Sequence, residues 1–189
     1  MTSLGTMESL DIHNVDARFV IEATDLKKEE KVGEGSYGWV YRGTWRDMQV
    51  ALKEVNLRDP DARQQLLTEA VGMQNLRPHG NIVTLYGVCP NPFAIVTEFC
   101  ANGSLDDMLY GKKPYSFSAP QIRKLVLGTA KGISHLHAEG VIHRDLAARN
   151  VLVDDRFEAK VADFGMARSD ELLAQGAESQ TKTTVFQTM

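Results

Sequence analysis

The sequence predicts an α+β fold in which a β-rich first part with one main helix precedes a mainly helical second part. Three observations lead to this prediction. Strand-type runs occupy residues 26–55 and recur within 82–99, where β-branched, aromatic and other apolar residues cluster. Apolar residues recur at helical spacing within 59–76. From 104 to 140, helix-start signals and a broad apolar face dominate instead.

The first part contains several strand signals and one helix signal. Strands are expected around residues 39–41, 50–52, 82–88 and 94–99, with Pro90 and Pro92 connecting the last two. The helix is expected over 59–76, where the apolar positions at helical spacing are Leu66, Leu67, Ala70 and Met73. A short apolar run, Phe19-Val20-Ile21, is expected either to add a strand or to pack on the edge of the domain.

The second part begins with helix-capping residues. A short helix is expected to start after Ser104, and a longer one after Ser118, where Gln121 completes a capping box. Gly140 is the expected end of the longer helix. Its apolar face is expected to contain Ile122, Leu125, Val126, Ile133 and Leu136. Two short strands around 151–153 and 160–162 are expected to flank a turn at Asp154-Asp155.

Composition limits the class of protein. The 189 residues are enough for one or two domains with hydrophobic cores. A net charge of −4 and a pI of about 5.7 argue against a nucleic-acid partner. Only Cys89 and Cys100 are present, which argues against a disulfide framework and suits a reducing compartment. We find no secretory signal and no membrane-spanning segment in this chain, and therefore expect a cytoplasmic location.

A glycine-rich segment, Gly33-Glu34-Gly35-Ser36-Tyr37-Gly38-Trp39-Val40, fits the pattern G-x-G-x-x-G-x-V. Taken alone, it could also be an ordinary glycine-rich turn. In a dinucleotide-binding fold a helix follows the glycines, whereas here strand-type residues follow them. The context therefore favours a hairpin that covers phosphate groups, because glycine lets the backbone approach the phosphates without a Cβ clash.

A lysine and a glutamate follow this segment. Lys53 ends the strand-type run Val50-Ala51-Leu52-Lys53, and Glu69 lies in the expected helix sixteen positions later. Each residue in isolation would be an ordinary solvent-exposed charge. A strand lysine held by a helix glutamate is, however, the arrangement that fixes an ammonium group on the phosphates of ATP.

Two further motifs indicate phosphoryl transfer. The first is His143-Arg144-Asp145-Leu146-Ala147-Ala148-Arg149-Asn150, which places an asparagine five positions after an aspartate. The second is Asp163-Phe164-Gly165. Phosphoryl transfer to a hydroxyl needs one carboxylate to orient the hydroxyl, and an asparagine and an aspartate to hold magnesium on the phosphates.

With these motifs the chain resembles the eukaryotic protein kinases from about Leu26 to Thr184. The resemblance implies a bilobal fold, with a flexible lead over 1–25, an N-lobe and hinge over 26–100, and a partial C-lobe over 101–189. It also implies ATP and Mg²⁺ as cofactors, a protein as substrate, and transfer of the γ-phosphoryl group to a Ser/Thr or Tyr hydroxyl.

The resemblance also assigns roles to individual residues. The implied catalytic residues are Asp145, Lys53, Glu69 and Arg149, and the implied metal ligands are Asn150 and Asp163. The implied nucleotide-binding residues are Val32, Gly33, Gly35, Gly38, Val40, Ala51, Lys53, the gatekeeper Thr97, the hinge residues Glu98 and Cys100, and Leu152. Met73, Leu85, His143 and Phe164 match a hydrophobic spine, and each is equally compatible with ordinary core packing.

The subfamily signals point in two directions. Gly43-Thr44-Trp45-Arg46 resembles the tyrosine-kinase-like group, whose members mostly phosphorylate Ser or Thr. Ala147-Ala148-Arg149 resembles tyrosine kinases, in which an arginine at the position of Arg149 serves near the phosphate. The acceptor preference therefore stays open. Phosphorylation after Gly165 is expected on Ser179, Thr181, Thr183 or Thr184, with Arg144 as the cationic partner.

The chain carries no A-P-E motif after Asp163-Phe164-Gly165. From the resemblance we expect a C-terminally truncated catalytic domain whose missing C-lobe elements are needed for a stable monomer. A bare apolar face on the long helix and impaired turnover are then expected. The alternative function is a kinase-like regulator that binds nucleotide without turning it over.

Overall fold

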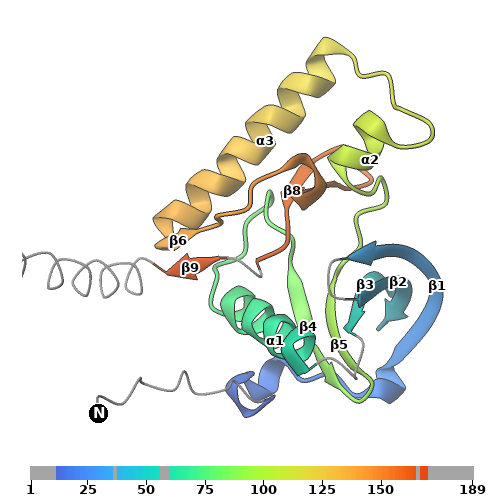
Figure 1. Cartoon of the computed structure of the whole chain (residues 1–189), viewed down its shortest axis with the longest axis vertical. Coiled ribbons are helices and arrows are strands. Elements are labelled where there is room, and N and C mark those ends of the chain that lie inside the picture. The colour runs from blue at the N-terminus through green and yellow to red at the C-terminus, as the bar shows by residue number, and fades with distance from the viewer. Residues whose placement is uncertain (1–11, 36–37, 56–59, 165–166, 170–189) are drawn as a thin grey trace, which may run out of the picture. The chain divides into compact units, whose positions relative to one another are not determined.

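The computed structural model describes residues 12–35, 38–55, 60–164 and 167–169. The chain divides into two compact units, shown in Figure 1. The first unit comprises Met1–Asn75 and Thr84–Phe99, and the second comprises Leu76–Val83 and Cys100–Met189. The expected α+β fold is confirmed, with an antiparallel sheet in the first unit and the longest of the described helices in the second.

The first unit is built on a five-stranded antiparallel sheet with the order β1-β2-β3-β5-β4. The strands are β1 (Leu26–Gly35), β2 (Gly38–Trp45), β3 (Met48–Val55), β4 (Leu85–Pro90) and β5 (Phe93–Glu98). The helix α1 (Pro60–Gln74) contacts β3, β4 and β5. Its buried residues are Ala62, Leu66, Leu67, Glu69, Ala70 and Met73, which include the apolar positions expected from helical spacing.

Residues 12–25, the described part of the chain before β1, also pack on the sheet. They form three short 3₁₀ turns at Ile12–Asn14, Ala17–Phe19 and Ala23–Asp25. Ile21 is 4% exposed and joins a core cluster with Val50, Leu52 and Val96. Its backbone N–H donates to the carbonyl of Val88 on β4 at 2.9 Å. The short apolar run therefore packs on the edge of the domain beside β4, which was one of the two expected outcomes.

In its described residues, the second unit contains two α-helices, a short 3₁₀ turn at Ala148–Asn150 and two small antiparallel sheets. The helices are α2 (Leu105–Tyr110) and α3 (Ala119–Ala138). The strands are β6 (Val141–Ile142), which pairs with β9 (Arg168–Ser169), and β7 (Val151–Val153), which pairs with β8 (Ala159–Val161). The expected capping box is present at the start of α3, where the Gln121 side chain accepts from the Ser118 N–H at 2.9 Å.

The segment Leu76–Val83 belongs to the second unit, although it lies between two stretches of the first unit in the sequence. Asn81 explains this placement, because its side-chain amide donates to the Ala159 carbonyl and its carbonyl accepts from Val161 N–H, both at 2.9 Å. Two glycines of α3 lie against this segment. A Cβ at Gly132 would come within 2.5 Å of the Asn81 carbonyl oxygen, and one at Gly128 within 2.9 Å of the Asn81 amide nitrogen.

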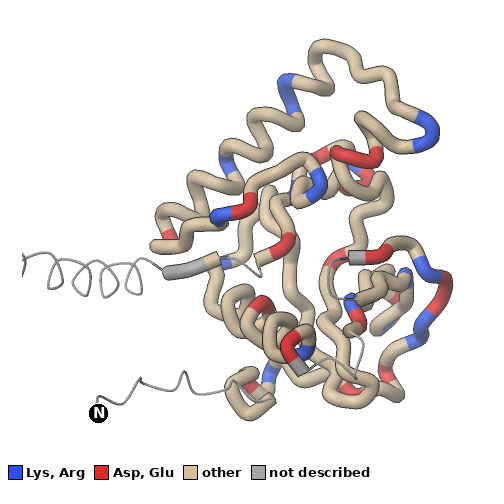
Figure 2. The backbone as a smooth tube through the Cα atoms, viewed as in Figure 1, with Lys and Arg blue, Asp and Glu red and all other residues tan. Residues whose placement is uncertain are grey.

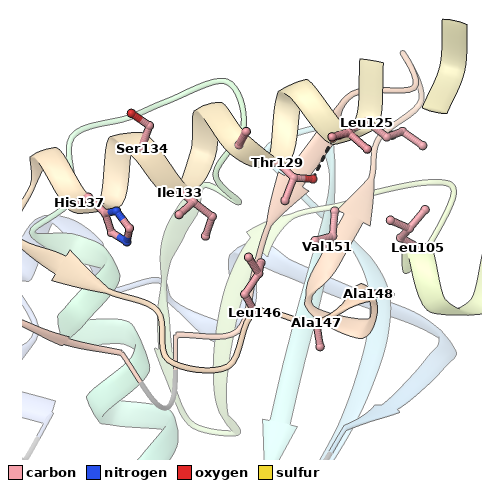
Figure 3. A pocket seen from close by; sticks show the side chains of 12 residues that line it. Leu105, Leu125, Thr129, Ile133, Ser134, His137, Leu146, Ala147, Ala148 and Val151 are labelled. Atoms are coloured by element: carbon pink, nitrogen blue, oxygen red, sulfur yellow. Dashed lines mark hydrogen bonds between the residues drawn. The ribbon is translucent and has the colours of Figure 1, made fainter. Parts of the chain in front are cut away.

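An apolar groove of about 700 Å³ runs between α3 and residues 146–151. Figure 3 shows Ile133 of α3 and Leu146 pointing into it from opposite sides. The apolar face expected for α3 is thus divided. Leu125 and Leu136 are buried, whereas Val126 is 64% exposed at the groove.

Charges of both signs alternate along β1 (Figure 2). The lysines are Lys27, Lys28 and Lys31, and the glutamates are Glu29, Glu30 and Glu34. Lys28 pairs with Glu54, and Arg42 pairs with Glu29. Such partly exposed ion pairs contribute little to the stability of the fold. Because acidic and basic residues are mixed along β1, this strand presents no continuous basic surface of the kind that binds nucleic-acid phosphates.

Candidate active site

In the first unit, Lys53 and Glu69 form a close ion pair. The Nζ of Lys53 on β3 lies 2.6 Å from Oε2 of Glu69 on α1. The Glu69 side chain is only 9% exposed and that of Lys53 is 21% exposed. A carboxylate this buried needs a charged partner, so the pair ties α1 to β3 and fixes the direction of the ammonium group.

The strand register gathers several predicted nucleotide-binding residues on one face of the sheet. Val40 lies opposite Lys53, and Gly33 lies opposite Val40. Ala51 is two residues from Lys53 on β3 and lies opposite Thr97 on β5. Directly opposed residues share a face, as do residues two apart in a strand. This face is half-buried, whereas the opposite face contributes to the core.

The glycines of the β1–β2 hairpin differ in their surroundings. Gly35 pairs with Gly38 at its end. A Cβ at Gly38 would collide with the carbonyl of Glu54, so close packing on β3 demands glycine there. A Cβ at Gly33 would meet only the Cβ of Val40 at ordinary contact distance. Val32 is 46% exposed, and Ser36 and Tyr37 lie outside the described residues.

Glu98, the last residue of β5, makes two hydrogen bonds to the backbone of Thr84. The carboxylate of Glu98 accepts from Thr84 N–H at 2.8 Å, and the Glu98 N–H donates to the Thr84 carbonyl at 3.0 Å. The hydroxyl of Thr97 donates to the Glu98 carbonyl at 3.3 Å. Cys100 belongs to the second unit, where it is buried and its carbonyl accepts from the N–H of Gly103.

In the second unit, Asp145 lies at the centre of a hydrogen-bond network. The Asn150 Nδ2 donates to the Asp145 carbonyl at 2.8 Å and to its Oδ2 at 2.9 Å. The Arg149 guanidinium donates to Oδ1 at 2.6 Å. This arginine contact lowers the pKa of the Asp145 carboxyl below its usual value, and the Asn150 hydrogen bond lowers it further. Asp145 is therefore a carboxylate at neutral pH.

A buried histidine connects this loop to the segment that carries Asp163. His143 is 3% exposed, and its Nε2 donates to the Ala162 carbonyl at 2.9 Å. Its Nδ1 accepts from Asp145 N–H at 3.3 Å, and the Ala162 N–H donates to the Asn150 carbonyl at 2.9 Å. Ala162, the residue before Asp163, is thus hydrogen-bonded to both His143 and Asn150, which ties the start of the Asp163 motif to the motif that carries Asp145.

The backbone takes an unusual conformation at two residues of these motifs. Arg144 and Asp163 have φ values of 67° and 63°, which are uncommon for residues other than glycine. Such strain is often found at functional sites, where the surrounding structure enforces it. Phe164 is buried, with its ring 5.6 Å from that of His143. Gly165 lies outside the described residues, as do the phosphorylation sites expected within 170–189.

The donor set fits magnesium held together with phosphate oxygens. A carbonyl and a carboxylate oxygen only accept hydrogen bonds, so the Asn150 atom facing Asp145 is Nδ2, and Oδ1 remains for a cation. Asn150 Oδ1 and the Asp163 carboxylate are oxygen ligands of the kind Mg²⁺ prefers. Within the described ranges, no group of three or more His, Cys, Asp and Glu residues is suited to hold a metal.

The structure therefore brings the predicted residues together in two sets. The first unit holds Lys53 with Glu69, and the same sheet face carries Gly33, Val40, Ala51 and Thr97. The second unit holds Asp145, Arg149, Asn150 and Asp163. Leu152 lies half-buried on β7 and forms an isolated antiparallel β-bridge with Ser104. Sequence reasoning missed the carboxylate of Glu98 and the amide of Asn81 as organising groups, because both act on partners distant in sequence.

The chain is similar to known protein kinases. The family described as "Protein tyrosine and serine/threonine kinase" matches residues 26–187. The serine/threonine-protein kinase STY46 of Arabidopsis thaliana is 40% identical over 78% of the chain, and the tyrosine-protein kinase csk-1 of Caenorhabditis elegans is 34% identical over 88%. The tyrosine-protein kinase Abl of Drosophila melanogaster is 41% identical over 77% of the chain.

The chain spans 26%, 32% and 9% of the lengths of these three relatives, respectively. Among the described helices, none combines the length and the apolar character needed to cross a membrane. The matched residues include both sets of site residues, from the glycine-rich hairpin to Asp163. The chain therefore belongs to the protein tyrosine and serine/threonine kinase family.

Proposed function

We propose that this chain supplies the nucleotide-binding and catalytic residues of an ATP-dependent protein kinase. The observation that carries this proposal is the pair of organised sets: Lys53 held by Glu69, and Asp145 held by Arg149 and Asn150. The first set suits an ammonium aimed at phosphate oxygens. The second suits a carboxylate aimed at a hydroxyl, beside oxygen ligands for magnesium.

In the proposed reaction the acceptor hydroxyl oxygen forms a bond to the γ-phosphorus as the bond from that phosphorus to the β–γ bridging oxygen breaks. Asp145 orients the hydroxyl and takes its proton. Its lowered pKa keeps it ionised, and its two neighbours hold the carboxylate in one orientation. Magnesium held by Asn150 and Asp163 would neutralise charge on the phosphates. Positioning and charge neutralisation supply most of the rate enhancement in this reaction class.

We further propose that the chain belongs to the tyrosine-kinase-like group and acts in the cytoplasm on a protein Ser/Thr or Tyr hydroxyl. Gly43-Thr44-Trp45-Arg46 supports the group, and the two buried cysteines, which form no disulfide, support a reducing compartment. Relatives named for both acceptor classes leave both hydroxyls in the proposal. Phosphoamino-acid analysis of a randomised peptide mixture would distinguish them.

Lys53→Met tests the nucleotide site. The substitution keeps an unbranched side chain but removes the charge that Glu69 holds in place. We expect the dissociation constant for Mg–ATP, measured by calorimetry, to rise about 10- to 100-fold, because hydrogen bonds to charged groups contribute about 1.5–3 kcal/mol.

Lys28→Met is the matched control. Lys28 lies on β1 of the same sheet and also pairs with a glutamate, but its side chain is 44% exposed. We expect its loss to leave Mg–ATP binding unchanged. Equal binding by the Lys53→Met and unsubstituted chains would contradict the proposed site. Binding without any phosphate transfer to peptides would favour the nucleotide-binding regulator.

Thr97→Met tests the assignment of the gatekeeper. Thr97 shares the sheet face of Ala51 and Lys53, and its side chain is smaller than that of methionine. We expect the larger side chain to weaken an ATP-competitive inhibitor that extends past Thr97 by about tenfold or more, while the affinity for Mg–ATP stays within about threefold. Equal inhibitor affinities in competition binding would count against this placement.

A further inference from the structure

The residues that precede the family-matched region make specific contacts with α1. Residues 12–25 lie outside the matched range, which begins at residue 26. The side-chain amide of Gln74, the last residue of α1, binds this segment with both of its polar atoms. Its Oε1 accepts from Asp16 N–H and its Nε2 donates to the Asn14 carbonyl, each at 3.0 Å. These two hydrogen bonds reach backbone groups on either side of Val15, so they fix the Gln74 side chain and residues 14–16 relative to each other.

The same segment is also anchored to the sheet. Val15, between the two bonded backbone groups, is 5% exposed, and Ile21 is 4% exposed. Ile21 N–H donates to the Val88 carbonyl on β4. At Gly87 of β4 a Cβ would collide with the Phe19 carbonyl, so segment and strand are in close contact. The segment therefore connects the end of α1 to β4.

This connection bears on the Lys53–Glu69 pair. Glu69 lies five residues before Gln74 on the same helix, and a helix moves largely as a rigid body. A 2.6 Å ion pair tolerates little displacement, because hydrogen bonds weaken steeply away from their preferred geometry. A translation of α1 that lengthened the ion pair would also have to break the Gln74 hydrogen bonds or move the segment away from β4.

We propose that residues 12–25 are a brace that holds α1 where Glu69 meets Lys53, and that Gln74 is a positioning residue for nucleotide binding. This inference rests on the proposed function, since it concerns the same ammonium group. The brace acts through α1 and Glu69 and does not contact the nucleotide itself.

Gln74→Leu removes both hydrogen bonds made by the side-chain amide while keeping the approximate size of the side chain. We expect the dissociation constant for Mg–ATP, measured by calorimetry, to rise about three- to tenfold, as for the loss of one or two ordinary hydrogen bonds. Asn75→Leu is the matched control, because within the described part of the chain the Asn75 side chain donates only to the carbonyl of Val71 in α1. Its Mg–ATP affinity should not change.

A second experiment, in a chain that already carries Glu69→Gln, distinguishes a positioning role of Gln74 from a general contribution to the stability of the fold. In a Glu69→Gln chain, Gln74→Leu should cause no further loss of affinity, because the brace acts through Glu69. An equal loss in both backgrounds, or no loss in either, would overturn the proposal. If Gln74→Leu lowers the melting temperature too far for calorimetry, Gln74→Glu keeps the acceptor for Asp16 N–H and should give a smaller rise. Unchanged affinity in that variant also overturns the brace.

The proposed function and the brace fail in different ways. If Lys53→Met leaves Mg–ATP binding unchanged, the nucleotide site is wrong whatever Gln74 does. If Lys53→Met weakens binding and Gln74→Leu does not, the site stands and only the brace is wrong.

Discussion

Replacing Asp145 with asparagine should lower the rate of phosphoryl transfer about 10²–10⁴-fold, the range for loss of a general base. Asparagine has the same shape but cannot take the proton of the acceptor hydroxyl. It also disturbs the network, because both carboxylate oxygens of Asp145 accept hydrogen bonds, one from Arg149 and one from Asn150. An amide must present its NH₂ group to one of these donors, which leaves two donors facing each other.

The measurement is the peptide phosphorylation rate at saturating Mg–ATP. Asp154→Asn is the matched control in the same unit. The Oδ1 of Asp154 accepts from the N–H groups of Arg156 and Glu158, and an asparagine oxygen can accept the same bonds. The control should keep its activity. An Asp145→Asn protein that retained more than about a tenth of the rate would exclude Asp145 as the base.

Gly132→Ala should destabilise the protein by about 1–3 kcal/mol, the usual cost of overpacking. Inside a helix, alanine normally adds about 0.5–1 kcal/mol of stability relative to glycine. At Gly132, however, the new Cβ would lie 2.5 Å from the Asn81 carbonyl oxygen and 2.9 Å from Cγ2 of Val161. That carbonyl also accepts a hydrogen bond from the Val161 N–H, so it cannot move away without loss.

Gly72→Ala in α1 is the control with the opposite expected sign. A Cβ at Gly72 would meet no atom within 4 Å, so this variant should gain about 0.5–1 kcal/mol from helix propensity. Urea unfolding of both variants gives the two free-energy changes. Equal stabilisation in both would show that α3 does not pack on the Asn81 segment as closely as the structure has it.

Features set by residues close in sequence were predictable. Ser118 and Gln121 form the expected capping box because helical geometry brings positions three apart together. Asn150 reaches Asp145 from five positions away within one short loop. The buried side of α1 followed from helical spacing, and the β-rich first part followed from strand propensity, because one-sided burial imposes a period on the sequence.

Tertiary structure alone decided the contacts between distant residues. Asn81 binds a carbonyl 78 positions away, and this bond is why Leu76–Val83 packs with the second unit. Gln74 binds backbone groups 58 and 60 positions earlier. The apolar pattern of α3 could not separate buried Leu125 from exposed Val126. A periodic pattern fixes which side of a helix is apolar, whereas the neighbours that cover it depend on how the whole chain packs.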